Sequence, residues 1–123
     1  MKALIVEDDL DIQSLIATIF SMDPRFSVSG LAESAEDGLE MARTTQPEVI
    51  VLDDRLAGVL RGVDAVPQFR TMAPNAKIIL FTNHRDVEAR AVDEPDVDAF
   101  LLKTDTGGLL PLAQQLTNML SLM

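Results

Sequence analysis

Five short apolar runs, separated by longer segments with helical spacing, limit most strongly how this chain can fold. The runs lie at residues 3–6, 27–31, 49–52, 77–81 and 99–102. Apolar runs of this length that alternate with amphipathic helical segments are typical of a parallel sheet covered by helices. The pattern therefore predicts an α/β fold in which five β/α units form one doubly wound parallel sheet.

Helix signals lie between the runs. Asp9 or Asp11 is expected to cap a first helix, which ends at Asp23 before a proline, and Ser34 is expected to cap a second. Further helices are expected over residues 63–72, over residues 85–92, and in a last segment with Pro111 near its start. The run at 49–52 is apolar throughout, which predicts a central strand buried on both faces.

Composition sets the class of protein. A chain of 123 residues is long enough for one domain and too short for two, so residues 1–123 are expected to form a single domain. Cysteine is absent, which excludes disulfides and thiolate metal sites. The net charge is −10, with no basic stripe, so direct nucleic-acid binding by this chain is not expected. Without a signal peptide or a long apolar segment, we expect a soluble, cytoplasmic protein without a membrane span.

Polar side chains follow four of the runs at the point where each run ends. Glu7 and Asp8 follow the first, Asp53 the third, Thr82 the fourth and Lys103 the fifth. Open α/β sheets bind ligands just outside the carboxyl ends of their strands. The sequence therefore predicts a functional site at that edge.

The acidic side chains indicate a metal. If the first and third strands are neighbours, Glu7, Asp8 and Asp53 converge. Two carboxylates about 4 Å apart repel each other by roughly 1 to 4 kcal/mol, so such a cluster favours a bound cation. Hard oxygen ligands that are open to water suit Mg²⁺. The alternative is that Asp8 and Asp9 only cap the first helix.

Asp53 is the candidate nucleophile. A carboxylate directly after a buried strand is held rigidly, and carboxylates can accept a phosphoryl group to form an acyl phosphate. That transfer depends on positioning and charge neutralisation, which Lys103 and the Thr82 hydroxyl can supply. Taken singly, the lysine and the threonine are ordinary strand-end residues, but beside Asp53 they favour the functional interpretation.

These motifs resemble the receiver domain of two-component response regulators of the chemotaxis-regulator type. The resemblance covers essentially the whole chain. It rests on four features: residues 6–9 (Val-Glu-Asp-Asp), Asp53 after four apolar residues, Thr82 after a phenylalanine, and residues 100–103 (Phe-Leu-Leu-Lys). It implies the flavodoxin-like strand order 2-1-3-4-5. It also implies a phosphorylation-activated signalling switch in a phosphorelay.

The resemblance implies roles for the acidic residues. Glu7 and Asp8 match the acidic pair that holds Mg²⁺, with Asp8 as the direct ligand. Asp53 matches both the phosphoacceptor and a metal ligand, and the backbone carbonyl of Arg55 matches the third protein ligand. Asp54 follows the acceptor directly, and strand alternation is expected to point its side chain away from the site.

The resemblance also implies how phosphorylation is sensed. Thr82 and Lys103 match the residues that contact the phosphoryl group, and Phe100 matches the aromatic switch residue. Arg55 and His84 occupy the two variable positions beside the site, where we expect them to tune the lifetime of the phosphorylated state. The only histidine, His84, is interpreted as a loop residue and not as a phosphate relay.

Three positions depart from the family pattern. Ala57 replaces a proline, which is expected to loosen the loop after the acceptor. Asn83 replaces a small residue and is expected to narrow access to the site. Thr104 follows Lys103 where the family has a proline, often in a cis peptide bond; the conformation of this peptide bond is left open.

The last segment indicates an interaction surface. No charged residue occurs from Thr106 to Met123, and apolar residues lie on more than one face of the expected helix. An exposed apolar patch there would mark partner binding. The alternative is a plain amphipathic helix with an uncharged outer face. The resemblance implies homodimerisation through the helix 4–strand 5–helix 5 face.

The expected function is that of a switch that catalyses only its own phosphorylation and dephosphorylation. A sensor histidine kinase or phosphotransfer protein is the expected donor. One alternative is the receiver half of a longer DNA-binding transcriptional regulator. A Mg²⁺-dependent aspartyl phosphohydrolase is disfavoured because Arg55 stands where a second acid is usual, and a flavin module is disfavoured because residues 7–9 would repel phosphate.

Overall fold

The computed structural model describes residues 1–58, 60–83 and 93–121 of the chain. In these residues, five parallel strands form one sheet in the order β2-β1-β3-β4-β5. The strands are β1 (Lys2–Val6), β2 (Ser27–Ala32), β3 (Val49–Leu52), β4 (Lys77–Thr82) and β5 (Ala99–Leu102). The helices are α1 (Leu10–Ser21), α2 (Ala35–Thr45), α3 (Gly62–Met72) and α5 (Leu109–Ser121), with a short 3₁₀ helix, η1 (Thr106–Gly108), before α5.

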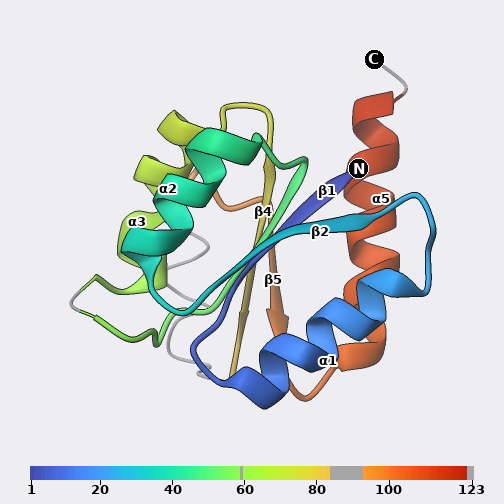
Figure 1. Ribbon diagram of the computed structural model, residues 1–123. Helices are drawn as coiled ribbons and strands as arrows, with labels where there is room; N and C mark the ends of the chain where they lie inside the picture. Colours follow the sequence, from blue (N-terminus) through green and yellow to red (C-terminus); the bar gives the residue numbers. More distant parts are fainter. Residues whose placement is uncertain (59, 84–92, 122–123) are drawn as a thin grey trace.

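The helices cover both faces of the sheet. Figure 1 shows α1 and α5 against one face and α2 and α3 against the other. The predicted α/β class and the strand order are therefore confirmed. Strands β3 and β5 begin and end where the sequence predicts, and the other described elements differ by one or two residues at their ends. The helix predicted over residues 85–92, and His84, lie outside the described residues.

Alternation along the strands builds two cores. Leu4 and Val6 of β1 pack with α2 and α3, whereas Ala3 and Ile5 pack with α1 and α5. This follows from the two-residue period of a strand, which sends successive side chains to opposite faces. All four residues of β3 are buried, as expected for a central strand covered on both faces.

Local capping fixes where two helices begin. The Asp9 side chain accepts the backbone N–H groups of Asp11 and Ile12 at 2.9 and 3.3 Å, so Asp9, not Asp11, caps α1. The Ser34 hydroxyl oxygen accepts the N–H of Asp37 at 3.1 Å and caps α2, as predicted. Such caps satisfy N–H groups that have no partner within the helix. Asp9 therefore serves as the N-cap of α1.

Helix α5 directs its leucine and alanine side chains toward the core over residues 109–118. Pro111, Gln115 and Asn118 are exposed, while Leu112 and Leu116 are partly buried against the α1 side of the core. This distribution fits the amphipathic alternative for residues 109–118. Of the described helices, none is both long and apolar enough to cross a membrane.

Candidate functional site

The candidate site lies at the carboxyl edge of the sheet, where backbone hydrogen bonds continue past the strand ends. The N–H of Asp53 donates to the carbonyl of Val6 at 3.0 Å, and the N–H of Lys103 donates to that of Thr82 at 3.1 Å. The N–H of Glu7 donates in the same way to the carbonyl of Ala32, the last residue of β2, at 2.8 Å. Because these residues extend the sheet, their side chains are carried on a rigid support.

The structure brings the three predicted acids together. One carboxylate oxygen each from Glu7, Asp8 and Asp53 lies within 4.8 Å of the others. Glu7 is 1% exposed and Asp53 is 5% exposed, whereas Asp8 is open to solvent. The cluster is thus buried on one side and accessible on the other, as a site for a small ligand requires.

Lys103 is shared by the two buried acids. Its Nζ donates a hydrogen bond to Asp53 Oδ2 at 3.0 Å and forms an ion pair with Glu7 Oε1. The ammonium lies against this Glu7 oxygen, so two buried carboxylates depend on a single cation. Buried charges need to be paired, and two buried carboxylates that share one ammonium favour a further cation.

Burial and neighbouring charges shift the pKa values of Glu7 and Lys103. Burial raises the pKa of Glu7 from 4.5 to about 7; the Lys103 ammonium opposes this rise and the Asp53 charge adds to it. Burial alone would lower the pKa of Lys103, but its contacts with Glu7 and Asp53 outweigh that effect and raise the pKa. The lysine is therefore a permanent cation, whereas Glu7 carries a proton part of the time at neutral pH.

The donor set fits a small divalent cation. Three carboxylates against one ammonium leave two negative charges in surplus when all four groups are ionised. Oxygen donors, one of them open to water, are what Mg²⁺ prefers. The structure therefore fits the expected metal site in its chemistry.

The other predicted residues have varied environments. Thr82 is the last residue of β4 and is fully buried, and Phe100 is half-buried against the core formed with α2 and α3. Arg55 and Asn83 are exposed beside the strand ends. The described part of the chain contains no cis peptide bond, so the bond between Lys103 and the next residue is trans.

Asp54 points away from the cluster, as strand alternation predicts. Its fully buried carboxylate accepts Arg61 Nε at 3.0 Å and the backbone N–H of Val63 at 3.1 Å. The loop that follows is also attached, since the N–H of Ala57 donates to the carbonyl of Glu33 at 3.3 Å. A proline at this position could not make that bond, so the expected loosening at Ala57 is offset by a different attachment.

Sequence reasoning missed two supporting residues. The Gln13 amide is buried and donates to the backbone carbonyl of Glu7 at 3.1 Å, which ties α1 to the acidic cluster. Gly62 lies so close to the acceptor that an added Cβ would lie 2.0 Å from the Asp53 carbonyl oxygen. The spacing of Gln13 from Ile16 and Phe20, a polar residue on an apolar helix face, was a usable signal. Gly62 had no comparable signal.

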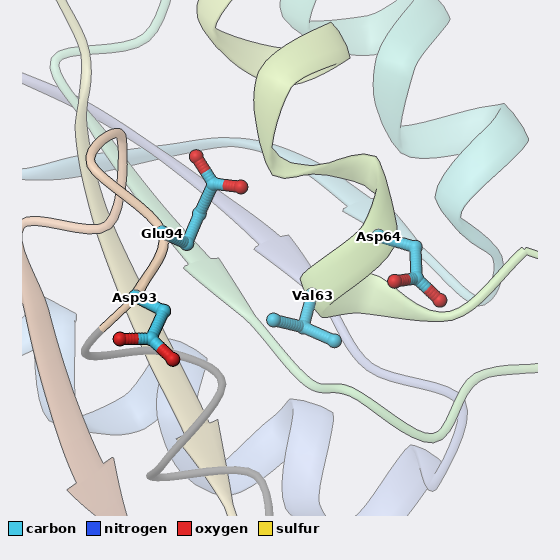
Figure 2. Close-up of a pocket in the computed structure, with 4 residues that line it drawn as sticks. All are labelled: Val63, Asp64, Asp93 and Glu94. Atoms are coloured by element: carbon cyan, nitrogen blue, oxygen red, sulfur yellow. The ribbon is translucent and has the colours of Figure 1, made fainter.

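A separate hollow lies beside the start of α3. It has a volume of about 400 Å³ and is lined in the described residues by Val63, Asp64, Asp93 and Glu94. Figure 2 shows these side chains coming from two places, the first turn of α3 and the segment before β5. Its acids include no buried, unpartnered group, so it carries no argument for a ligand.

The comparisons with known proteins agree with this geometry. The sequence pattern of the response regulator receiver domain matches residues 3–111, which is most of the chain. This chain belongs to the response regulator receiver family. The predicted resemblance is therefore confirmed, and the chain is a receiver domain of the kind found in response regulators.

Curated relatives of this receiver domain are longer proteins. It is 41% identical over 88 residues to protein-glutamate methylesterase/protein-glutamine glutaminase 2 of Paramagnetospirillum magneticum, covering 72% of this chain and 25% of that protein. It is 30% identical over 105 residues to response regulator protein VraR of Staphylococcus saprophyticus, covering 85% and 50%. The chain thus spans a quarter to a half of the length of these two relatives.

Solved receiver domains share the fold. The response regulatory domain of protein mrkE from Klebsiella pneumoniae superposes with a TM-score of 0.87 at 20% identity, covering 100% of both chains. The response regulator domain of Thermotoga maritima CheB superposes with a TM-score of 0.84 at 18% identity, covering 96% of both. At these identities the likeness establishes the fold alone.

Proposed function

We propose that Asp53 of this receiver domain accepts a phosphoryl group from a phosphohistidine on a sensor histidine kinase or phosphotransfer protein. A carboxylate oxygen of Asp53 attacks phosphorus, the phosphorus–nitrogen bond breaks, and the imidazole leaves with the electron pair of that bond. The observation that carries the proposal is the shared ammonium, with Lys103 Nζ 3.0 Å from Asp53 Oδ2 and also paired with Glu7. This places a fixed positive charge where the phosphoryl group would arrive.

Glu7, Asp8 and Asp53 would hold Mg²⁺, together with the backbone carbonyl of Arg55. When bound, the ion would neutralise charge on the phosphoryl group. The acid cluster, with one ammonium for two buried carboxylates, supports this assignment. With a cation on the carboxylates, Lys103 is free to move its hydrogen bond from Asp53 to a phosphoryl oxygen.

Phosphorylation is then sensed by Thr82 and Phe100. Thr82 ends β4, and Phe100 lies in the neighbouring strand β5, paired in register with Leu80. A shift of the Thr82 hydroxyl toward phosphate would leave room for the Phe100 ring to turn inward. This shift would bias a pre-existing equilibrium at the face that includes β5 and α5, which is the proposed surface for homodimerisation.

We further propose that residues 1–123 act as one signalling domain in the cytoplasm, without direct nucleic-acid binding and without catalysis beyond their own phosphorylation and dephosphorylation. The methylesterase relative matches over only a quarter of its length. The relative named nitrate/nitrite response regulator protein NarL, from Escherichia coli, matches at 28% identity over 46% of its length. The proposal therefore includes the case in which this chain is the receiver part of a longer transcriptional regulator.

The test is incubation with acetyl phosphate and Mg²⁺, followed by intact mass measurement. One phosphoryl adduct is expected, lost in Asp53→Ala and lost when Mg²⁺ is chelated. The matched control is Asp54→Asn, which changes the adjacent acid. This variant should still form the phosphoryl adduct by the end of the incubation. An unmodified wild-type chain, or an adduct that survives in Asp53→Ala, would reject the assignment.

Dimerisation is tested separately by sedimentation. Beryllofluoride mimics the acyl phosphate, so adding it with Mg²⁺ should increase the dimer fraction. Gln115 is exposed on α5, and Gln115→Glu places a charge on that face without touching the site. It should reduce the dimer fraction while phosphorylation continues. A monomer under both conditions contradicts this part of the proposal.

A further inference from the structure

We infer that Asp54 is a positioning residue for the proposed site, which it serves by capping α3 from outside the helix and closing the loop that follows Asp53. The inference rests on the proposed function, because it concerns how the cation-binding and phosphoryl-accepting atoms are held. Asp54 does not touch the acidic cluster itself. It acts through the backbone that it shares with Asp53 on one side and with Arg55 on the other.

The contacts of Asp54 converge on three consecutive residues. Its Oδ2 accepts Arg61 Nε at 3.0 Å and forms an ion pair with the same guanidinium. Its Oδ1 accepts the N–H of Val63 at 3.1 Å, and its backbone carbonyl accepts the N–H of Gly62 at 2.8 Å. Asp54 is fully buried and its bond to Val63 is shielded from water, whereas the Arg61 side chain is 43% exposed. One residue thus anchors the whole start of α3.

Helix α3 depends on this external cap. Its own N-cap residue, Arg61, makes no side-chain capping bond. The first N–H groups of a helix have no partner within the helix, and an acidic group at that end also interacts favourably with the helix dipole. The Asp54 carboxylate supplies both effects from the segment that follows β3. The helix is therefore attached directly to the residue that follows the acceptor.

The closure is tight enough to define the backbone at the site. An added Cβ at Gly62 would lie 2.0 Å from the Asp53 carbonyl oxygen, so the first residue of α3 lies against the acceptor's own main chain. The loop between is also attached to the start of α2, since the N–H of Leu60 donates to Glu36 Oε1 at 3.4 Å. Arg55, whose carbonyl is the proposed third metal ligand, is the first residue of this closed loop.

Loss of the Asp54 carboxylate should loosen the loop and misplace that carbonyl. Partners that orient metal ligands typically change metal affinity by about 10- to 100-fold when they are removed. We expect Asp54→Ala to weaken Mg²⁺ binding by about tenfold or more. Asp54→Asn should have a smaller effect, because its amide oxygen can still accept the N–H of Val63 while the charge facing Arg61 is lost.

The experiment is calorimetric titration of Mg²⁺ into the whole chain, paired with the rate of acetyl phosphate labelling. Asp23→Ala is the matched control. Asp23 is also a nearly buried acid, 7% exposed and paired with an arginine, but it lies in the turn between α1 and β2, beside the amino ends of the strands. Both alanine variants should lower thermal stability, and only Asp54→Ala should weaken Mg²⁺ binding and slow labelling. Asp54→Asn keeps the side-chain shape and serves if Asp54→Ala does not fold.

The outcomes separate this inference from the proposed function. Equal losses of Mg²⁺ affinity in the Asp54 and Asp23 variants would overturn the inference, because general destabilisation would explain both. Wild-type affinity in both Asp54 variants would overturn it too, even if Asp53 is phosphorylated. An unlabelled wild-type chain whose Mg²⁺ affinity still depends on Asp54 would reject the phosphorylation and support the positioning role.

Discussion

Two clusters in this receiver domain shift the pKa of a buried acid in opposite directions. The Asp23 cluster consists of Asp23, Arg25 and Gln114, and the Glu7 cluster consists of Glu7, Asp53 and Lys103. At the turn between α1 and β2, the Asp23 carboxylate accepts bonds from the Arg25 side chain at 2.7 to 3.1 Å, from its backbone N–H at 3.0 Å, and from Gln114 Nε2 at 3.0 Å. At the carboxyl edge, Glu7 and Asp53 share one ammonium. The pKa of Asp23 is far below its usual range, chiefly through the hydrogen bond from Arg25, whereas that of Glu7 is raised to about 7 by burial.

Burial and the supply of donors both contribute to the difference. Asp23 is 7% exposed and Glu7 is 1% exposed, so Glu7 is the more deeply buried of the two acids. The supply of donors also differs: the Asp23 cluster is complete, with one arginine for one carboxylate, whereas the Glu7 cluster is incomplete, with one ammonium for two buried carboxylates. A complete cluster ties elements together without help, here joining the end of α1 to α5. An incomplete cluster favours a further cation, which is the basis of the proposed Mg²⁺ site.

Removing the shared ammonium is expected to have the largest effect. Lys103→Met should lower the free energy of unfolding by about 3 kcal/mol or more, because taking one partner from a buried ion pair leaves uncompensated charge. Arg25→Met is the control and should cost less, since the Arg25 side chain is more than half exposed. Urea unfolding followed by circular dichroism suits a chain without Trp or Tyr. Equal losses in the two variants would show that the clusters do not differ.

Glu7 should make stability depend on pH in Mg²⁺-free buffer. Its pKa is raised from 4.5 to about 7, so its contribution is fully present below about pH 4.5 and is lost as pH rises through about 7. The shift corresponds to about 3 kcal/mol at 1.36 kcal/mol per unit. Glu7→Gln mimics the protonated form. Its stability relative to wild type should therefore increase between pH 5 and 8, and a difference independent of pH would contradict the raised pKa.

The layout of the fold was predictable because its signals are local. The apolar runs at 49–52 and 99–102 coincide with β3 and β5, and Ser34 caps α2 as its sequence context indicates. The strand order was not predictable from such local signals, since they say little about which strands are neighbours. The order came from the resemblance to receiver domains, and it is this order that brings Asp53 beside Glu7.

The residues that meet at the site were predictable, but the number of hydrogen-bond donors available to each carboxylate was not. Residue types and strand ends indicated that Glu7, Asp53 and Lys103 would meet. Sequence does not record how many donors each carboxylate obtains after folding. The pairing of Asp54 with Arg61 depends on the path of a loop with no regular spacing, so these contacts emerged only from the structure. The same holds for Gly62, whose need for a small side chain comes from one close approach.

Asp53→Asn should stabilise the chain in Mg²⁺-free buffer. The substitution removes one of two buried carboxylates that share Lys103, and repulsion between two such charges is on the order of 1 kcal/mol or more. Glu7 then has the ammonium to itself. We expect the free energy of unfolding to rise by about 1 kcal/mol, with the stabilisation by Mg²⁺ largely lost. A decrease would mean that the Asp53–Lys103 bond outweighs the repulsion and that the cluster is already balanced.

Asp23→Asn should have the smallest effect and the opposite sign. The pKa of Asp23 is lowered from 3.8, so its contribution is present above pH 3.8 and is lost as pH falls toward its folded pKa. The variant should be less stable than wild type at neutral pH, and the two should converge in acid. The loss stays small because Arg25 is largely in water, where solvent screens the pair. Stability measured from pH 7 down to pH 2 tests this, and a variant that gains stability at neutral pH, as expected for Asp53→Asn, would remove the distinction between the two clusters.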